Sequence, residues 1–366
     1  MLSRDQLQRG AADGGFQIES YEKVCVLIDL LGAIRAHPFL GHRMALKGGT
    51  ALNLFVLDFP RLSVDIDLNY IGASDRATML NERPRIEQAL EQVFSRLRLV
   101  VKRAPNEHAG GKWRLTYTSA LGRPGTLEVD VNFMLRTPLW PAAPRDSHSV
   151  GGLTARQILV LDEHELAAGK LAALVARGAS RDFFDACMLL RHSTLDPQKL
   201  RLGFVVYGGA NREDWRSISI DRITTTAADV DAQLVPMLRK DLRPQKHEID
   251  DWTNALIQEA HQLLSILLPL TEQEREFLEQ LNGNGEIVPE LLTNDPAMQE
   301  VIRGHPGVNW KALNIKRRIG VMPVSLAKEA RLPRSSEELV GASLERAHED
   351  AGPARAGRAV RTKAVT

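Results

Sequence analysis

Two aspartates, Asp65 and Asp67, stand one residue apart in segment 61–68 of this chain, inside an alternating apolar pattern. Alternate residues of a strand point to the same face, so both carboxylates should project together while Ile66 faces the core. Two like charges so close together repel each other and are costly to bury unless a cation lies between them. The spacing therefore predicts a site for a hard divalent cation, for which Mg²⁺ is the natural choice.

A Gly-Gly pair precedes the aspartates, directly after an apolar segment that ends on Leu46 and Lys47. Gly48 and Gly49 allow backbone N–H groups to approach an anion closely. A helix expected from Thr50 would aim its positive N-terminal end at the same place. A phosphate site beside a metal site indicates nucleotide chemistry.

A third carboxylate, Asp130, lies on a later alternating segment, with Glu128 and Asn132 on its own face. Alone, Asp130 would be an ordinary solvent-facing strand residue. If its strand neighbours the one that carries Asp65 and Asp67, however, three carboxylates come together. Two can then hold Mg²⁺, and the third can help to take a proton from an attacking hydroxyl.

Residues 165–185 hold a second group of charged side chains. Lys170 and Arg177 are seven residues apart on one helical face, and Arg181 precedes Asp185 by one turn. The surroundings of Lys170 are almost wholly Ala, Leu and Gly, so its charge could cancel that of a triphosphate. Asp182 or Asp185 could orient this ammonium or the neighbouring guanidinium. The alternative is a solvated face with an ion pair worth only tenths of a kcal/mol.

The apolar periodicity predicts the elements that must position these residues. The expected helices of the first part are 18–36, 50–57 and 76–98, and the expected strands are 44–46, 64–70, 98–103, 112–119 and 126–135. Later helices are expected at 155–176, 181–191, 225–241, 250–267 and 272–282. This order indicates an α+β fold with a mixed sheet, followed by a mostly helical part. We expect an α/β domain over 1–150, a helical domain over 151–320 that completes the active-site cleft, and a flexible tail over 321–366.

The composition is that of an ordinary globular protein, with 366 residues, 43% of them hydrophobic and 25% charged. A formal net charge of +1 gives no global argument for a nucleic-acid or membrane partner. Cys25 and Cys187 have no second thiol nearby, which argues against a disulfide framework or a zinc site. No signal-peptide core and no apolar run of membrane-spanning length is present, so we expect a cytoplasmic protein.

The order of the motifs resembles the AbiEii/AbiGii family of nucleotidyltransferase-like toxins, within the wider DNA polymerase β-like nucleotidyltransferase superfamily. The motifs are Lys-Gly-Gly-Thr-Ala-Leu at 47–52, Arg-x-Ser-x-Asp-x-Asp-Leu at 61–68, the strand residue Asp130, and the Lys170 to Asp185 segment. The resemblance covers roughly residues 20–320 and includes Leu-Thr-Glu at 270–272 and Pro-x-x-x-Trp-Lys at 306–311. Each motif alone is weak, whereas four in this order are specific for the fold and its chemistry.

The resemblance implies a role for each matching position. The implied nucleotide-binding residues are Lys47, Gly48, Gly49, Thr50, Arg177, Arg181 and Asp182. The implied catalytic residues are Ser63, Asp65, Asp130, Lys170 and Asp185. The implied metal ligands are Asp65, Asp67 and Asp130. The chain departs from the family after Arg318, and no role is transferred to that tail.

The function implied by the resemblance is Mg²⁺-dependent transfer of a nucleotide from an NTP to an acceptor hydroxyl, expected to be the 3′ end of tRNA. Such a toxin would block translation, act in a toxin–antitoxin system or phage defence, and be neutralised by an antitoxin that often carries a winged-helix domain. Alternatives are transfer to a small molecule or a protein hydroxyl, or a non-catalytic nucleotide-binding module. The intact Asp65, Asp67, Asp130 and Lys170 argue against the last.

A tRNA acceptor would need an open cleft with basic edges, with Arg177 or Arg181 close to Asp65. Further positive charge is present later in the chain, at Lys311, Lys316, Arg317 and Arg318 and in the segment 352–366. Lysines and arginines near a terminus are equally expected on an ordinary solvated surface. The sequence does not identify the acceptor or the base of the NTP.

Overall fold

The computed structural model describes residues 2–105, 110–191 and 195–321. Within this part of the chain, seven strands form one mixed sheet in the order β3-β4-β5-β2-β1-β7-β6. The strands are β1 (Met44–Lys47), β2 (Asp65–Tyr70), β3 (Val100–Arg103), β4 (Gly110–Thr118), β5 (Pro124–Asn132), β6 (Ala143–Arg145) and β7 (Ile158–Val160). The expected α+β class with a mixed sheet is confirmed. The basic segment 352–366 lies outside the described residues.

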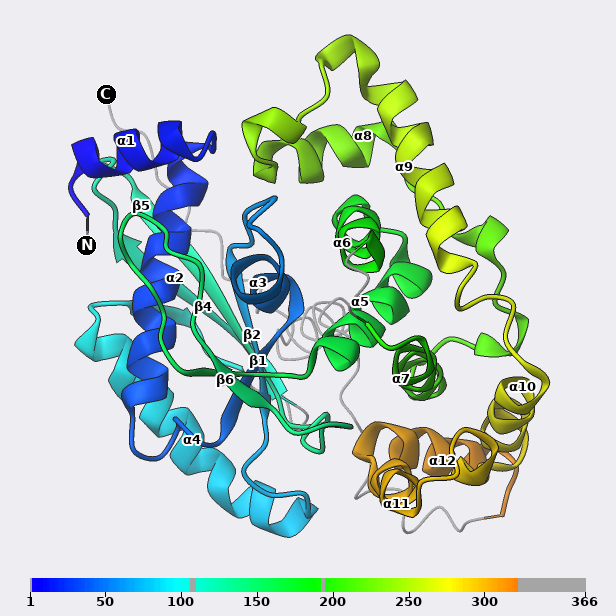
Figure 1. The fold of residues 1–366 in the computed structure, drawn as a ribbon. Helices are drawn as coiled ribbons and strands as arrows, with labels where there is room; N and C mark the ends of the chain where they lie inside the picture. Colours follow the sequence, from blue (N-terminus) through cyan, green and yellow to red (C-terminus); the bar gives the residue numbers. More distant parts are fainter. Residues whose placement is uncertain (1, 106–109, 192–194, 322–366) are drawn as a thin grey trace, which may run out of the picture.

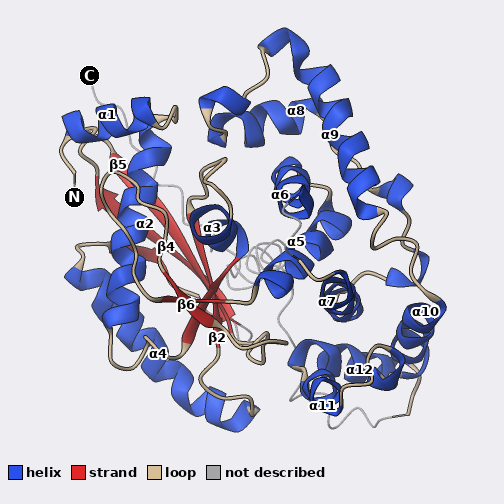
Figure 2. Cartoon of the chain, in the orientation of Figure 1, coloured by secondary structure: helices blue, strands red, loops and turns tan. Residues whose placement is uncertain are grey.

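Helices flank the sheet and, joined by loops, form the second half of the described chain apart from β7 (Figures 1 and 2). Those of the first half are α1 (Arg4–Asp13), α2 (Ile18–Ala36), α3 (Gly48–Ala51) and α4 (Arg76–Arg96). Those of the second half are α5 (Glu163–Arg177), α6 (Ser180–Arg191), α7 (Pro197–Gly209), α8 (Ala227–Asp229), α9 (Ile249–Leu264), α10 (Glu272–Glu279), α11 (Pro296–Gly304) and α12 (Pro306–Arg318). None of the described helices combines the length and the apolar character needed to cross a membrane.

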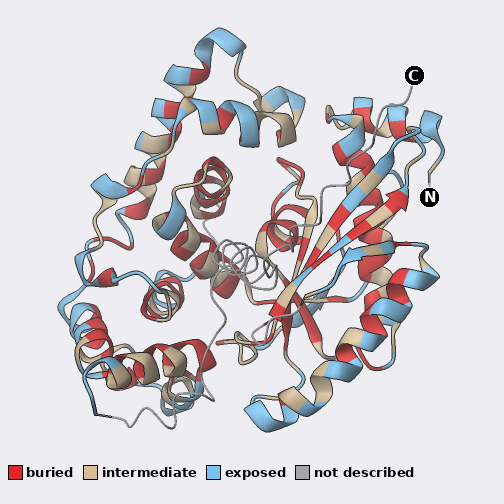
Figure 3. Cartoon of the chain, turned by 180° about the vertical axis from the view of Figure 1, so that it is seen from behind, coloured by how far each residue is buried: buried red, intermediate tan, exposed pale blue. Residues whose placement is uncertain are grey.

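Strand β2 lies in the middle of the sheet, and its neighbours decide which residues meet its two aspartates. It pairs in parallel with β5 and antiparallel with β1. Its apolar residues Ile66 and Leu68 are buried, because α2 and α4 pack along that face of the sheet (Figure 1). The face with Asp65 and Asp67 is turned instead toward α3 and the helices that follow β7. Buried residues gather where the helices meet the sheet, and exposed ones lie on the outer sides (Figure 3).

The helix expected over 155–176 is wrong in its first turns. Residues 158–160 form β7, which pairs with β6 and β1. Helix α5 begins only at Glu163, because the Asp162 side chain accepts a hydrogen bond from the N–H of His164 as an N-cap. Strand β7 follows residue 150 and still belongs to the sheet. The domain boundary expected near residue 150 therefore stays a prediction.

The helix expected over 225–241 is also wrong, because this segment is divided into α8, a π-helix at Val230–Leu234 and 3-10 turns at Val235–Met237 and Lys240–Leu242. Pro236 lacks an N–H donor, and its ring clashes with the carbonyl four residues before it, so an α-helix cannot continue through it. The described helices α1, α7, α11 and α12 were not expected. Each begins at a capping residue, such as Asp196 before Pro197.

Glu165 joins the sheet side of the molecule to its helical side. Its side chain is buried on α5 and accepts hydrogen bonds from the backbone N–H groups of Leu139 and Trp140, at 3.0 and 3.4 Å. It also accepts one from the Tyr207 hydroxyl on α7, at 2.6 Å. Burial raises the pKa of Glu165 to about 7, although these donors act against the shift.

This raised pKa predicts a pH-dependent stability. The folded chain holds a proton on Glu165 that the unfolded chain releases near pH 4.5, so the contribution of Glu165 is full at low pH and declines as the pH rises toward 7. We expect the stability of Glu165→Gln, relative to wild type, to be greater at pH 8 than at pH 5 in chemical denaturation. The more exposed Glu163→Gln, on the same helix, serves as the control for loss of a carboxylate. A pH-independent difference for Glu165→Gln would contradict the prediction.

Candidate active site

The three predicted metal carboxylates lie on two neighbouring strands. In the parallel register of β2 and β5, Asp67 stands opposite Asp130, and Asp65 stands opposite Glu128. Directly opposite residues present their side chains to the same face of a sheet. The expectation that the strand of Asp130 neighbours that of Asp65 and Asp67 is therefore confirmed.

Two lysines complete the row that contains Asp67 and Asp130. Lys47 at the end of β1 is opposite Asp67, and Lys112 of β4 is opposite Asp130. The row thus runs from a cation through two carboxylates to a second cation. Burial raises the pKa of Asp65 and the charge of Asp67 raises it further, while Lys112 acts against both. The negative charge is crowded enough to favour a cation.

Gly48 and Gly49 form the turn beside this row. Gly48 has a φ of +73°, and a Cβ added there would lie 2.3 Å from Oδ2 of Asp67. At Gly49, a Cβ would lie 2.9 Å from Oγ of Ser63. Only glycine allows the backbone to lie this close to both side chains. The helical segment that starts here continues as a π-helix to Val56, and the first N–H groups of a helix have no acceptor within it.

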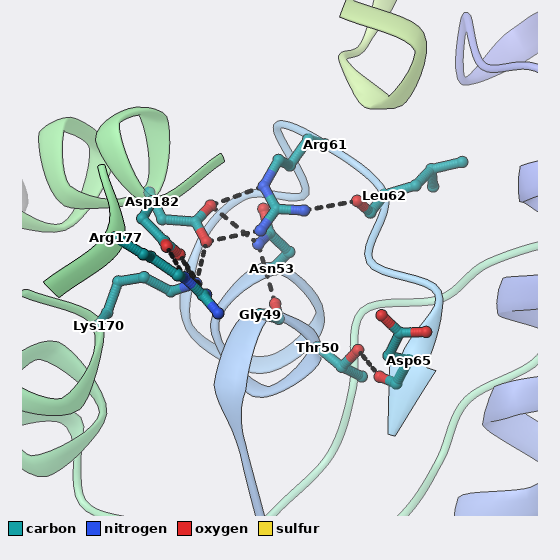
Figure 4. A network of polar contacts seen from close by, with 10 residues as sticks. Gly49, Thr50, Asn53, Arg61, Leu62, Asp65, Lys170, Arg177 and Asp182 are labelled. Atoms are coloured by element: carbon teal, nitrogen blue, oxygen red, sulfur yellow. Dashed lines mark hydrogen bonds and ion pairs between the residues drawn. The ribbon is translucent and has the colours of Figure 1, made fainter. Parts of the chain in front are cut away.

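Thr50 holds this turn against β2. Its buried hydroxyl donates a hydrogen bond of 2.5 Å to the backbone carbonyl of Asp65 (Figure 4). The hydroxyl is thus engaged within the fold, and the backbone N–H is the group of Thr50 suited to a phosphate. Ser63 lies half-buried at the same turn, next to Gly49.

A buried ion-pair network joins the helical part to this turn. Nζ of Lys170 on α5 lies 2.9 Å from Asp182 and 2.9 Å from Asp185, both on α6. Asp185 in turn receives two hydrogen bonds from Arg61, at 2.7 and 2.6 Å, in a bidentate pair. The Asn53 amide donates to Asp185 and to the Gly49 carbonyl, at 3.4 and 2.9 Å (Figure 4).

The charges of this network are distributed so that its carboxylates stay ionised. Burial alone would raise the pKa of Asp185, but Arg61 and Lys170 outweigh it and hold that pKa well below its usual range. Lys170 and Arg177 lower the pKa of Asp182 in the same way. Three cations therefore face two carboxylates, and this group of five carries one surplus positive charge.

The predicted residues of α5 and α6 occupy different depths. The side chain of Asp185 is fully buried, so it orients Arg61 and Lys170 and does not itself reach a nucleotide. Asp182 is almost as buried and holds Arg177 at 2.6 Å. Arg177 itself is 63% exposed, so it remains accessible to a ligand.

The cations of the helical part act on the carboxylates of β2. The charge of Arg181 lowers the pKa of Asp65 and so opposes the effect of burial. The pKa of Arg177 is raised mainly by its hydrogen bond to Asp182, and the charge of Asp67 raises it further. The charges of predicted residues from the two halves thus influence one another. The expectation that Arg177 or Arg181 lies near Asp65 agrees with these couplings.

Sequence reasoning missed three residues of this site: Arg61, Asn53 and Lys112. Arg61 is flanked by Pro60 and Leu62, and an arginine in such apolar surroundings needs a buried carboxylate partner. That signal was available in the sequence, but the partner was not, because Asp185 is 124 residues away along the chain.

The donor set fits a hard divalent cation. No three His, Cys, Asp or Glu side chains in the described ranges are already grouped as a metal site. The side chains of Asp65, Asp67 and Asp130 nevertheless offer carboxylate oxygens on one face of neighbouring strands. Burial, and after it the neighbouring Asp67, raises the pKa of Asp65, so a cation bound here would stabilise its ionised form.

Lys311 does not belong to a basic surface. It is buried on α12, where its ammonium donates to the carbonyls of Asn211, Arg212 and Glu213, at 2.9, 3.2 and 3.4 Å. It therefore fixes the chain that follows α7. The sequence left open whether Lys311 and Lys316 belong to an RNA footprint or to a solvated surface, and the ammonium of Lys311 belongs to neither, because it is used inside the fold.

Comparisons with known proteins identify a family and a fold. Residues 29–267 match the model of a family described as nucleotidyl transferase AbiEii toxin, type IV TA system. Among solved structures, the chain is similar to MenT4, a nucleotidyltransferase toxin from Mycobacterium tuberculosis, with a TM-score of 0.50 and 18% identity over 84% of this chain and 99% of that one. At this identity the likeness concerns the fold, and it confirms the expected nucleotidyltransferase fold. A search of curated proteins finds no significant match.

The ion pair between Arg61 and Asp185 predicts a large effect on stability. Arg61→Met removes the guanidinium and leaves the carboxylate of Asp185 buried without this partner. Breaking a buried pair in this way typically costs about 3–5 kcal/mol. Arg216→Met removes a guanidinium from a pair with Asp214 that is partly exposed, and should cost less than about 1 kcal/mol. Urea denaturation of both variants measures the difference. Equal losses would show that the buried pair is not a main support of the fold.

Proposed function

This chain belongs to the family of AbiEii nucleotidyltransferase toxins of type IV toxin–antitoxin systems, and on that premise we propose that it transfers a nucleotide from an NTP to the 3′-terminal hydroxyl of a tRNA. The proposal depends on one observation above all. The carboxylates of β2 and β5 stand beside the Gly48-Gly49 turn, and cations from α5 and α6 act on the same carboxylates. The groups that we propose for binding phosphate and metal thus come from neighbouring strands and the turn beside them.

In this proposal the triphosphate is held by groups from both halves of the molecule. The first N–H groups of the helical segment at Gly48 and Gly49 would donate to a phosphate, and Lys47 ends the strand before them. Lys170 has three N–H donors, two of which are directed at Asp182 and Asp185, so a third can contact a phosphate oxygen. The surplus positive charge of the network stabilises the charge that develops on the leaving pyrophosphate.

Asp65, Asp67 and Asp130 would hold Mg²⁺. When bound, the metal would neutralise phosphate charge and orient the reacting oxygen atoms. The acceptor hydroxyl oxygen bonds to the α-phosphorus, the bond to pyrophosphate breaks, and the hydroxyl proton passes to a carboxylate of this group, for which Asp130 is the candidate. Arg177 and Arg181 remain at the phosphates throughout.

The acceptor and the partner belong to the same proposal. A tRNA end brings several phosphates close to its terminal hydroxyl, and the exposed Arg177 beside the carboxylates suits such a polyanion. A small molecule or a protein hydroxyl is the alternative acceptor. The family implies an antitoxin as partner, for which we propose a protein with a winged-helix domain, and a cytoplasmic location follows from such a target.

Asp65→Asn tests this assignment without threatening the fold. Because the carboxylate of Asp65 is disfavoured by burial and by Asp67, its neutralisation should leave the stability unchanged or higher. Transfer of labelled nucleotide to total tRNA with Mg²⁺ should fall by more than ~100-fold, as expected when an essential electrostatic interaction is removed. The matched control is the exposed Asp221→Asn, which should transfer as wild type does.

Retained transfer by a folded Asp65→Asn protein would contradict the carboxylate mechanism. Label found in a small molecule or a protein, with none in tRNA, would replace the proposed acceptor and leave the chemistry in place. Lys170→Ala is a less direct test. It removes the proposed phosphate contact, and it also removes a cation that pairs with Asp182 and Asp185. Its activity therefore has to be compared with wild type together with its stability.

A further inference from the structure

We propose that the sheet face of β3 and β4 binds the sugar-phosphate backbone of a single-stranded RNA end and leads it to the carboxylates of β2. The proposal rests on the proposed function, since it supplies the path by which an RNA acceptor reaches the transfer site. The observations that carry it are the strand register, the exposure of three cations, and their continuity with Asp65 and Asp67.

Strand β4 separates its residues cleanly between the two faces of the sheet. Trp113 and Leu115 are buried, and Trp113 contacts Phe94 of α4 edge-on, so this face packs against the helices. Lys112 and Arg114 point the other way and have side chains 51% and 60% exposed. They therefore share the face of Asp65 and Asp67, on the side of the sheet away from α4.

The register places the cations in line with the carboxylates. Asp65 of β2 is opposite Glu128 of β5, which is opposite Arg114 of β4, which is opposite Arg103 of β3. Neighbouring strands lie about 4.8 Å apart, so Arg114 and Arg103 stand roughly 10 and 15 Å from the row position of Asp65. Positive charge thus begins two strands away from the transfer site and continues to the edge of the sheet.

The charge balance of this face favours a polyanion. Glu128 of β5 lies between Asp65 of β2 and the cations of β4. Its carboxylate is contacted by Lys112 and by Arg114, at 2.8 and 2.9 Å. With the exposed Arg103, three cations of β3 and β4 face two acids of β5, Glu128 and Asp130, which leaves one positive charge on this part of the sheet. Lys112 is also stabilised by Asp65 and Asp130, which raise its pKa in addition to the larger effect of Glu128.

The proposed ligand is an RNA strand, because the row of cations on β3 and β4 ends beside Asp65, where an acceptor hydroxyl has to arrive. A phosphodiester chain carries regularly spaced charges that can pair with successive cations on β4 and β3. Val100 is 55% exposed next to them and stands opposite Thr116, on the same face as Arg114. Its methyl groups offer an apolar surface to an unstacked base.

The test measures RNA binding without NTP, so that it does not depend on catalysis. The probe is a 5′-fluorescein-labelled single-stranded RNA with a free 3′ end, followed by fluorescence anisotropy over a series of salt concentrations. The variant is the double substitution Arg103→Ala with Arg114→Ala. The matched control removes two exposed arginines elsewhere, Arg9→Ala on α1 with Arg96→Ala on α4.

We expect Kd for RNA to rise about tenfold in the sheet-face variant. The log–log salt slope should fall by about 1.4, or ~0.7 for each phosphate of a single strand that no longer pairs with an arginine. The control should bind RNA as wild type does. In the transfer reaction, KM for RNA should rise in the sheet-face variant while kcat is kept, because the carboxylates are untouched.

Equal RNA affinities of wild type and the sheet-face variant would overturn this inference, and transfer by wild type to tRNA would then still support the proposed function. An equal loss in the control variant would also overturn it, since binding would then follow net charge alone. Wild type that transfers no nucleotide to any RNA would count against the proposed function, and its RNA binding would still be compared with that of the variant. Failure of RNA to bind, together with binding of an acidic protein to this face, would replace the occupant and contradict the inference.

Discussion

The buried bidentate ion pair between Arg61 and Asp185 is the interaction on which the site depends. Arg61 lies just before β2, and Asp185 lies on α6, so this contact fixes the helical part against the sheet. Both groups are removed from water, where an uncompensated charge would be costly, and the pair is stable only while each partner is in place. Lys170 and Asn53 reach the same carboxylate and thereby acquire fixed positions beside the Gly49 turn.

Charge is arranged in alternating layers around this contact. The carboxylates of β2 and β5 lie between two groups of cations, those of α5 and α6 on one side and those of β4 and β3 on the other. Cations lie near these carboxylates, yet burial and the charge of Asp67 still raise the pKa of Asp65 above its ordinary value. This partial compensation is what a site for a metal ion and a polyphosphate requires, because full internal pairing would leave no attraction for either.

Buried and exposed members of the site divide its work. Asp185 and Asp182 are buried and act through the cations that they orient. Arg177 and Lys112 are anchored at one end by a carboxylate and remain exposed, so they can contact a ligand without first being ordered. Because side-chain order is already provided by the fold, less conformational entropy is lost when a ligand binds.

The sequence alone determined the local features of this protein. Alternation around Asp65 and Asp67 predicted their shared face, the Gly-Gly pair predicted a close turn, and the ordered motifs predicted the family, because these properties depend on residues near one another in the chain. Helix limits were less predictable. The three apolar residues of β7 are too few to distinguish the period of a strand from that of a helix, so the sequence places them in the helix expected over 155–176.

Only the tertiary structure decided which distant residues meet. It gave Arg61 its partner Asp185, directed the Thr50 hydroxyl to the backbone, and placed Lys311 inside the fold. It also aligned Arg114 with Asp65 across the sheet. These contacts follow from strand register and helix packing, which join segments that are far apart in sequence, and no local pattern carries that information.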